Sequence, residues 1–263
     1  MPALYKYFSD DRLDVLENGL IKFTRPNDFN DPFELPLIVD GLFDSENQLR
    51  DILNNKIYND TNFLSDIHRE ILNNYNISDR LVGVLMREHK MVAEKIYENI
   101  KRSLADIGVL CLTTKCDNLL MWSHYANSHK GFVVEFDGCH EFFNRRRSDD
   151  DEFGWVRKVM YVDERPKCSF MNLNFEEFIL TKGRCWEYED EHRMSMPIYA
   201  RDVVVNGSNL FRYPRECIRS VVAGARCGDE VLGRLRKYCD GNRTDFFRAV
   251  LSDSAYALSF VKI

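Results

Sequence analysis

The segment 118–131, with the sequence NLLMWSHYANSHKG, places large aromatic side chains beside amide and imidazole groups. On a helix, four of its side chains would fall within about 60° of one another: Asn118, Trp122, Tyr125 and His129. Such a face, with Ser123 and His124 beside it, could stack on a planar ligand such as a nucleobase or nicotinamide and hydrogen-bond to it. A buried aromatic seam with satisfied polar tips would give the same pattern.

The segment 182–193, with the sequence KGRCWEYEDEHR, concentrates carboxylates near a cation. If it forms a strand, one face carries four charged side chains: Glu187, Glu189, Glu191 and Arg193. The three like charges repel one another, and Arg193 can pair with only one or two of them. A partly buried carboxylate in such a cluster can have a shifted pKa and take part in catalysis. An exposed acidic edge, with Trp186 and Tyr188 in the core, is the alternative.

A third candidate is the turn-forming stretch 29–34, FNDPFE, which carries two phenylalanines. Asn30 and Asp31 can brace this loop through side-chain to backbone hydrogen bonds. Alternatively, they line the mouth of a pocket beside Tyr5 and Tyr7, which belong to the first expected strand.

The composition of the chain and the motifs that it lacks argue against several classes of protein. The chain has 263 residues, a net charge of −6 and 44% hydrophobic residues, which indicates a globular protein without an extensive basic surface for nucleic acid. The GxxxxGK[ST] phosphate loop, the GxGxxG pattern and the GxSxG pattern are absent, which argues against an NTPase, a classical dehydrogenase and an esterase. No stretch is apolar enough to span a membrane, and the start does not resemble a signal peptide. We therefore expect a cytoplasmic protein that makes no membrane contact.

Metal binding is not expected. His124 and His129 are five residues apart, about 140° around a helix, so they are poorly placed to share a metal. The HExxH pattern is absent, and none of the eight cysteines forms a CxxC pair. In the cytoplasm these cysteines should be reduced thiols.

These side chains must be positioned by the strands and helices that the sequence predicts. Because these strands and helices mix without strict alternation, we expect an α+β fold with mixed or antiparallel sheets. Strands are expected at 4–7, 20–24, 109–113, 132–136, 156–162, 195–199, 218–223 and 255–263. A first helix, capped by Ser9 or Asp10, should end at Asn18–Gly19. Further helices are expected after 113, at 175–182 and at 228–238.

Residues 45–107 differ in character, because they are rich in Asn, Asp, Ile and Leu at helical spacing. The clearest helix starts at Ser78 and passes through Leu104, with Gly108 as its expected stop. We predict a single domain, 1–263, with 45–107 as a helical insert that packs on the first sheet or acts as a lid.

Four segments together resemble the bacterial domain-of-unknown-function family 2971. They are LYKY at 4–7, FNDPFE at 29–34, LMWSHY at 120–125 with Lys130–Gly131, and WxYExExR at 186–193. The resemblance is weakest at 45–107 and 138–155. Members of this family look like accessory genes of bacteria, some near defence loci, which implies an antiviral or toxin role.

The order of elements is also remotely similar to that of ADP-ribosyltransferase-like proteins. This similarity implies an NAD co-substrate, with Glu191 or Glu189 as the carboxylate near the ribose. It implies Trp122 or Tyr125 as the ring that stacks on nicotinamide. The phosphate partner would be Arg193 or Lys6, because Tyr5 stands where such enzymes carry His or Arg.

These features lead to a first hypothesis and two alternatives. The first is an NAD-using ADP-ribosyltransferase-like or NAD-glycohydrolase-like protein with a nucleotide substrate and a protein or nucleic-acid acceptor. An alternative is a non-enzymatic sensor that binds a nucleotide or a phage component. A weaker alternative is a metal-dependent nuclease that uses His124, Glu189 and Glu191.

Overall fold

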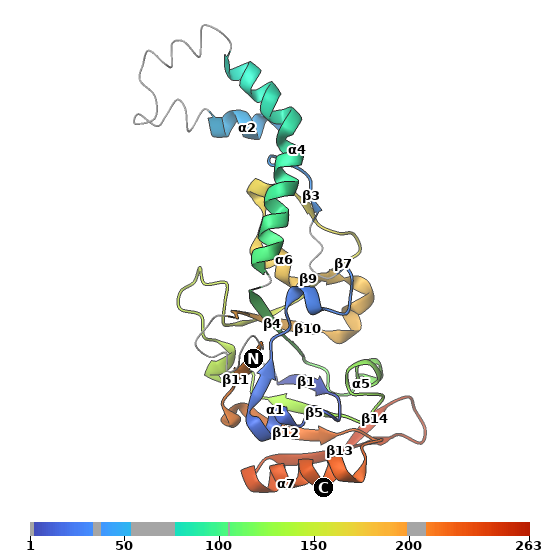
Figure 1. Cartoon of the computed structure of the whole chain (residues 1–263). Coiled ribbons are helices and arrows are strands. Elements are labelled where there is room, and N and C mark those ends of the chain that lie inside the picture. Colours follow the sequence, from blue (N-terminus) through green and yellow to red (C-terminus); the bar gives the residue numbers. More distant parts are fainter. Residues whose placement is uncertain (1–2, 34–37, 54–76, 105, 199–208) are drawn as a thin grey trace. The chain divides into compact units, whose positions relative to one another are not determined.

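The computed structural model describes residues 3–33, 38–53, 77–104, 106–198 and 209–263 (Figure 1). The chain forms two compact units. Unit 1 comprises 1–35, 105–163 and 179–263, and unit 2 comprises 36–104 and 164–178. The single domain expected from the sequence stays a prediction.

Unit 1 is built on an eight-stranded sheet in the order β14-β13-β12-β5-β1-β4-β10-β6. The strands are β1 (Leu4–Phe8), β4 (Ile107–Thr113), β5 (Phe132–Phe136), β6 (Val156–Lys158), β10 (Glu191–Pro197), β12 (Ile218–Ala223), β13 (Asp245–Leu251) and β14 (Leu258–Lys262). All neighbours are antiparallel except β12 and β13, which are parallel. The predicted α+β class, with a mixed and mostly antiparallel sheet, is confirmed.

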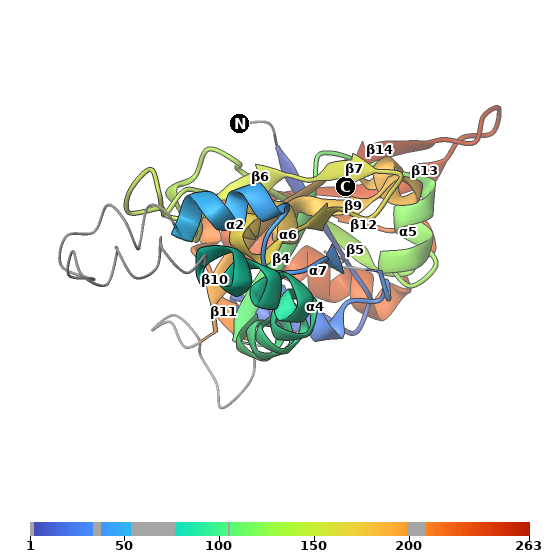
Figure 2. The same ribbon diagram turned by 90° about the horizontal axis from the view of Figure 1, so that it is seen from above.

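Successive side chains of the central strands enter two separate cores, because strand residues alternate between faces. Leu4 and Phe8 of β1 belong to the larger core, which also holds Leu235 of helix α7 (Asp229–Asn242). Tyr7 belongs to the smaller core, together with Trp122 of helix α5 (Leu119–Tyr125). Helices α7 and α5 therefore cover opposite faces of the sheet. The hairpin formed by β13 and β14, at the edge of the sheet, extends beyond the other strands (Figure 2).

The sheet is weakly joined between β1 and β4. β1 pairs with β5 along its whole length, and β4 pairs with β10 from Thr113 to Ile107. Between β1 and β4, however, the ladder consists of the single pair Tyr5↔Thr113. Beyond that pair, the ammonium of Lys6 donates to the backbone oxygen of Cys111 over 2.9 Å. A side chain thus takes the place of a backbone partner, and the two strands diverge.

Smaller elements complete the description. They are β2 (Leu20–Lys22) paired with β11 (Leu210–Arg212), β7 (Met160–Val162) paired with β9 (Thr181–Gly183), α1 (Asp14–Asn18), α6 (Phe175–Leu180), and the 3-10 helices η1 (Pro26–Asp28), η3 (Glu141–Phe143), η5 (Arg184–Glu189) and η6 (Arg215–Cys217). The single strand predicted at 156–162 is wrong, because β6 and β7 belong to different sheets.

The first helix ends where predicted, at Gly19, whose φ of 64° lies in the left-handed region that glycine adopts readily. Its start differs from the prediction. The N-cap is Leu13, without a side-chain cap, so neither Ser9 nor Asp10 performs that role.

In unit 2, the structure describes α2 (Glu46–Leu53), α4 (Ile77–Leu104), η4 (Phe170–Asn172) and the parallel pair β3 (Ile38–Val39) and β8 (Lys167–Cys168). Both helices lie within the predicted helical insert. Gly108 is not the stop of α4, because it is part of β4. Among the described residues, no helix is long and apolar enough to cross a membrane.

Candidate functional site

A cavity of about 420 Å³ opens in unit 1 beside the place where β1 and β4 diverge. Tyr5 and Lys6, which are adjacent on β1 and point to opposite faces, both line it. The other lining residues are Tyr7, Lys22, Thr24, Asp28, Phe29, Asn30, Cys111, Leu112, Thr113, Met121, His124, Tyr125, Lys182, Glu189 and Glu191. The cavity therefore collects aromatic rings, lysines and carboxylates from segments far apart in the sequence.

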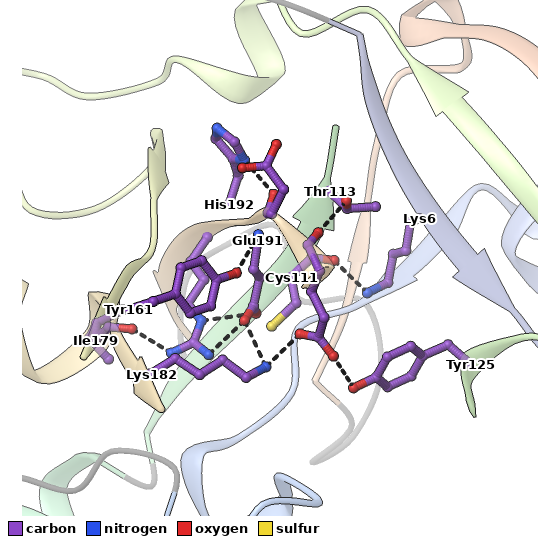
Figure 3. Close-up of polar contacts among 12 residues, drawn as sticks. Lys6, Cys111, Thr113, Tyr125, Tyr161, Ile179, Lys182, Glu191 and His192 are labelled. Carbon is purple, nitrogen blue, oxygen red and sulfur yellow. Dashed lines mark hydrogen bonds and ion pairs between the residues drawn. The ribbon is translucent and has the colours of Figure 1, made fainter. Parts of the chain in front are cut away.

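Its base is a buried ionic cluster, which we define as Lys182, Glu189, Glu191 and Arg193 (Figure 3). Nζ of Lys182 lies 2.7 Å from Oε2 of Glu189 and 2.9 Å from Oε2 of Glu191. Arg193 binds Glu191 in a bidentate manner, with Nε and Nη2 each 2.9 Å from a carboxylate oxygen. Its Nη1 donates to the backbone oxygen of Ile179 over 2.6 Å. All four side chains are at most 6% exposed, so these contacts compensate the loss of hydration.

A turn at Asp190 brings the two glutamates together. Residues 184–189 form η5, Asp190 adopts a φ of 44°, and β10 begins at Glu191. A single continuous strand through this segment, on which the predicted face of charges depended, is therefore wrong. Glu187 is exposed and does not join the cluster, whereas Glu189 and Glu191 converge on Lys182.

Helix α5 supplies a second contact to Glu189. The hydroxyl of Tyr125 donates to Oε1 of Glu189 over 2.6 Å. The helix begins at Asn118, whose Oδ1 accepts from the backbone of Leu120 and Met121. The same side chain donates through Nδ2 to the backbone oxygen of Tyr188 over 2.8 Å. Asn118 thus fastens the start of α5 to the residue before Glu189.

The pKa values of the ionisable side chains are shifted in different directions across the site. Burial by itself raises the pKa of Glu191, but the neighbouring Arg193 and Lys182 outweigh that effect and hold it well below its usual value. Burial, reinforced by the Glu189 carboxylate, raises the pKa of Tyr125 above its usual range. Burial and the nearby Glu135 raise the pKa of Tyr5 to about 12. At neutral pH the site therefore holds protonated phenols beside an ionised carboxylate.

Only some residues of the proposed stacking face reach the cavity. Trp122 is fully buried, donates to the backbone oxygen of Cys116, and does not line the cavity. Tyr125 and His124 do line it. Ser123 is exposed at the surface and bonds within α5 to the backbone oxygen of Leu119.

The prediction that His129 continues this helix is wrong. α5 ends at Tyr125, and three successive residues then have positive φ: Asn127, Ser128 and His129. A close approach of the backbone follows, because a Cβ at Gly131 would lie only 2.0 Å from the backbone oxygen of Phe8. The ring of His129 stacks on Trp122 instead, with centroids 6.0 Å apart, away from the cavity lining.

Of the other residues predicted for the site, some line the cavity and others do not. Asn30 lines the cavity, but Asp31 braces its loop by accepting from the backbone of Phe33 over 2.9 Å. Arg193 lies behind the cavity, where it holds Glu191 and packs on the ring of Phe29. Tyr5, Lys6 and Tyr7 all reach the cavity.

Several residues of the site were not predicted from the sequence. Lys182 joins the two glutamates, and Lys22 and Cys111 line the cavity. Tyr161 accepts from the backbone of Glu191 over 2.7 Å. For Lys182, the signal available was its closeness in sequence to the acidic segment. Lys22 and Cys111 belong to β2 and β4, whose pairings with β11 and with β1 and β10 no local pattern reveals.

The nuclease alternative named His124, Glu189 and Glu191 as its residues. All three line the cavity, and both glutamates contact Lys182. Throughout the part of the chain that the structure describes, no three His, Cys, Asp or Glu side chains are grouped so that they could hold a metal ion.

Comparison with known families bears on the central part of this site. Residues 121–194 match the family model described as protein of unknown function (DUF2971). The matched stretch includes Tyr125, Lys182, Glu189 and Glu191, whereas the resembling segments at 4–7 and 29–34 lie outside it. No curated protein and no solved structure gave a significant match. The similarity to ADP-ribosyltransferase-like proteins stays a prediction.

Proposed function

We propose that the cavity of unit 1 cleaves the bond between nicotinamide and ribose in NAD, as a glycohydrolase or an ADP-ribosyltransferase. The observation that supports this most directly is the position of Glu189. Its carboxylate lines a cavity with aromatic walls and is held by Lys182 on one oxygen and by Tyr125 on the other. Such a fixed carboxylate can stabilise positive charge that develops on a bound sugar.

The reaction balances without a further cofactor. The bond from ribose C1 to the nicotinamide nitrogen breaks, and its electron pair leaves with neutral nicotinamide. The oxocarbenium-like ribose is stabilised by the carboxylate and then captured by water or by a nucleophile of an acceptor, which loses a proton. Tyr125 and Tyr5 offer rings for the planar leaving group, since Trp122 is buried elsewhere.

Glu189 suits this role better than Glu191. Glu191 accepts two bonds from Arg193 and one from Lys182, so its oxygens are largely occupied. Each oxygen of Glu189 accepts one bond from a described residue, which leaves lone pairs for a ligand. We therefore assign the charge-stabilising role to Glu189 and a positioning role to Glu191.

The test is nicotinamide release from NAD by the purified full-length protein. We expect Glu189→Gln to lower kcat/KM about 100-fold or more. Glu187→Gln is the matched control, because Glu187 lies in the same 3-10 helix but is exposed. Absence of release by the wild-type protein, or equal rates for Glu189→Gln and wild type, would overturn the proposal.

Tyr125→Phe gives an independent measurement, since it retains the ring and removes only the hydroxyl that binds Glu189. Loss of one hydrogen bond to a charged group is expected to lower the rate about 10-fold. We expect this decrease in kcat with little change in the melting temperature. An unchanged kcat would show that this hydroxyl does not position the carboxylate.

A binding module that uses the same cavity is the second candidate. It is favoured by the saturation of the ionic cluster, in which every charged group already contacts a partner of opposite charge. In this case NAD or ADP-ribose would raise the melting temperature without turnover. A role in bacterial defence or in a toxin system fits either candidate and rests on the family resemblance. A protein or nucleic-acid acceptor belongs only to the transferase candidate.

A further inference from the structure

Two lysines of the cavity are not used by the ionic cluster. The carboxylates of Glu189 and Glu191 contact Lys182 and Arg193. Lys6 donates to a neutral backbone oxygen, that of Cys111. The side chain of Lys22 makes no ion pair or hydrogen bond with any residue that the structure describes. Both residues nevertheless belong to the lining of the cavity.

Their positions are fixed by neighbouring elements. Lys6 lies at the middle of β1. Lys22 is the last residue of β2 and is half-buried, and its neighbours in sequence, Ile21 and Phe23, belong to the larger core. Thr24 lines the cavity two residues farther on. The lining that the structure describes contains one carboxylate outside the cluster, that of Asp28, which is exposed. Besides the ionic cluster, the lining of the cavity therefore includes two lysines, a threonine and one exposed aspartate.

Holding two like charges in a partly dehydrated space is costly unless an anion joins them. Loss of hydration, with smaller contributions from Arg12 and Lys22, lowers the pKa of Lys6, while Cys111 and Glu191 oppose that shift. A phosphate group would supply a negative charge to Lys22, which has no ion pair with a described residue, and can accept from several donors at once.

We propose that Lys22 and Lys6 form a phosphate subsite, so that the cavity takes a ligand with a diphosphate rather than a free nucleoside. This inference rests on the proposed function for the other end of the ligand, which it places near Glu189 and Tyr125. Lys6 and Tyr5 point to opposite faces of β1, so the cavity extends past the strand and can hold a long ligand. Arg193 is occupied by Glu191 and by the backbone of Ile179, and it does not provide this subsite.

The experiment is calorimetric titration of the full-length protein with ADP-ribose, and with adenosine as the phosphate-free comparator. We expect ADP-ribose to bind more tightly than adenosine. Lys22→Gln should weaken ADP-ribose binding about 10-fold and leave adenosine unchanged. Lys237→Gln is the matched control, because Lys237 is an exposed lysine of α7 outside the cavity lining. Inorganic pyrophosphate should compete with ADP-ribose in the wild type and less well in Lys22→Gln.

A charge-retaining variant guards against a folding effect. Lys22→Arg should bind ADP-ribose within about 3-fold of wild type, since it keeps the cation. The subsite is overturned if Lys22→Gln binds ADP-ribose as tightly as wild type, if ADP-ribose binds no more tightly than adenosine, or if Lys22→Arg is as weak as Lys22→Gln.

The two proposals fail in different ways. If ADP-ribose binding depends on Lys22 but NAD is not cleaved, the subsite stands and the cleavage proposal falls. If NAD is cleaved and Lys22→Gln has an unchanged KM for NAD, the cleavage proposal stands and the subsite falls.

Discussion

At the scale of single residues, Glu191 is the anchor of the site. It is 4% exposed and contacts both cations of the ionic cluster. Removing a buried carboxylate from two cations leaves them without sufficient compensation. The loss should therefore exceed the value of an ordinary hydrogen bond.

We expect Glu191→Gln to lower the free energy of unfolding by about 3–5 kcal/mol at pH 7. Urea denaturation followed by circular dichroism measures this difference. Glu187→Gln, at an exposed position of the adjacent 3-10 helix, should change it by less than about 0.5 kcal/mol. A similarly small change for Glu191→Gln would show that the cluster adds little to stability.

The pH dependence follows from the lowered pKa of Glu191. Its stabilising contribution is complete above the unfolded pKa of about 4.3 and decreases as the pH falls towards the folded value. The advantage of wild type over Glu191→Gln should therefore shrink below about pH 4 by about 1.4 kcal/mol per pH unit. Denaturation at pH 7, 5 and 3 tests this. A constant difference at all three values would contradict the lowered pKa.

At the scale of elements, the turn between η5 and β10 decides which glutamates meet. The alternation of residues in 187–193 predicted the convergence of Glu189 and Glu191, but it wrongly added Glu187. One left-handed residue, Asp190, shifts the face on which the preceding side chains lie. Single-sequence patterns do not reveal such a residue, because aspartate also adopts ordinary conformations.

Local patterns were more informative for the strands. The strands at 4–7, 132–136 and 218–223 were predicted, because their side chains alternate between two cores. The cavity itself was not predictable in full. Lys22 and Cys111 reach it through pairings between strands that are distant in the sequence. His129 was misplaced because the packing of Gly131 against Phe8, rather than helical periodicity, determines the chain after α5.

Asn118 offers a test of how α5 is held. Asn118→Ala removes both the cap of the helix and the bond to the backbone oxygen of Tyr188, so it should destabilise the protein by about 1–2 kcal/mol. Asn118→Asp keeps the cap acceptor and removes the donor. We expect its melting temperature to lie between those of wild type and Asn118→Ala. Equal melting temperatures for the two variants would mean that the cap does not contribute.

At the scale of the whole molecule, the chain passes between the two units four times. Each crossing lies close in sequence to a residue of the cavity or of its supporting contacts: Asn30, Cys111, Tyr161 and Lys182. The connections to unit 2 therefore border segments that build the site in unit 1.

We therefore expect Leu49→Ala, in the buried part of α2 in unit 2, to weaken ADP-ribose binding several-fold. The matched control is Leu235→Ala in α7, which truncates an equally buried leucine in unit 1. Both should lower stability by about 2–5 kcal/mol. Calorimetric titration, at a temperature where both variants are folded, separates them. Equal affinities would show that unit 2 does not influence the cavity.

The central place of β1 has a consequence for the order of events during synthesis. Tyr5 leaves the ribosome well before its partners in the sheet, which are Thr113 and Glu135. β1 must therefore wait, unpaired, until at least Thr113 has emerged. Long-range pairing of this kind is slow and leaves strand edges exposed to other chains. Folding yield in the cell should thus depend on translation speed and chaperones more than on the stability of the finished sheet.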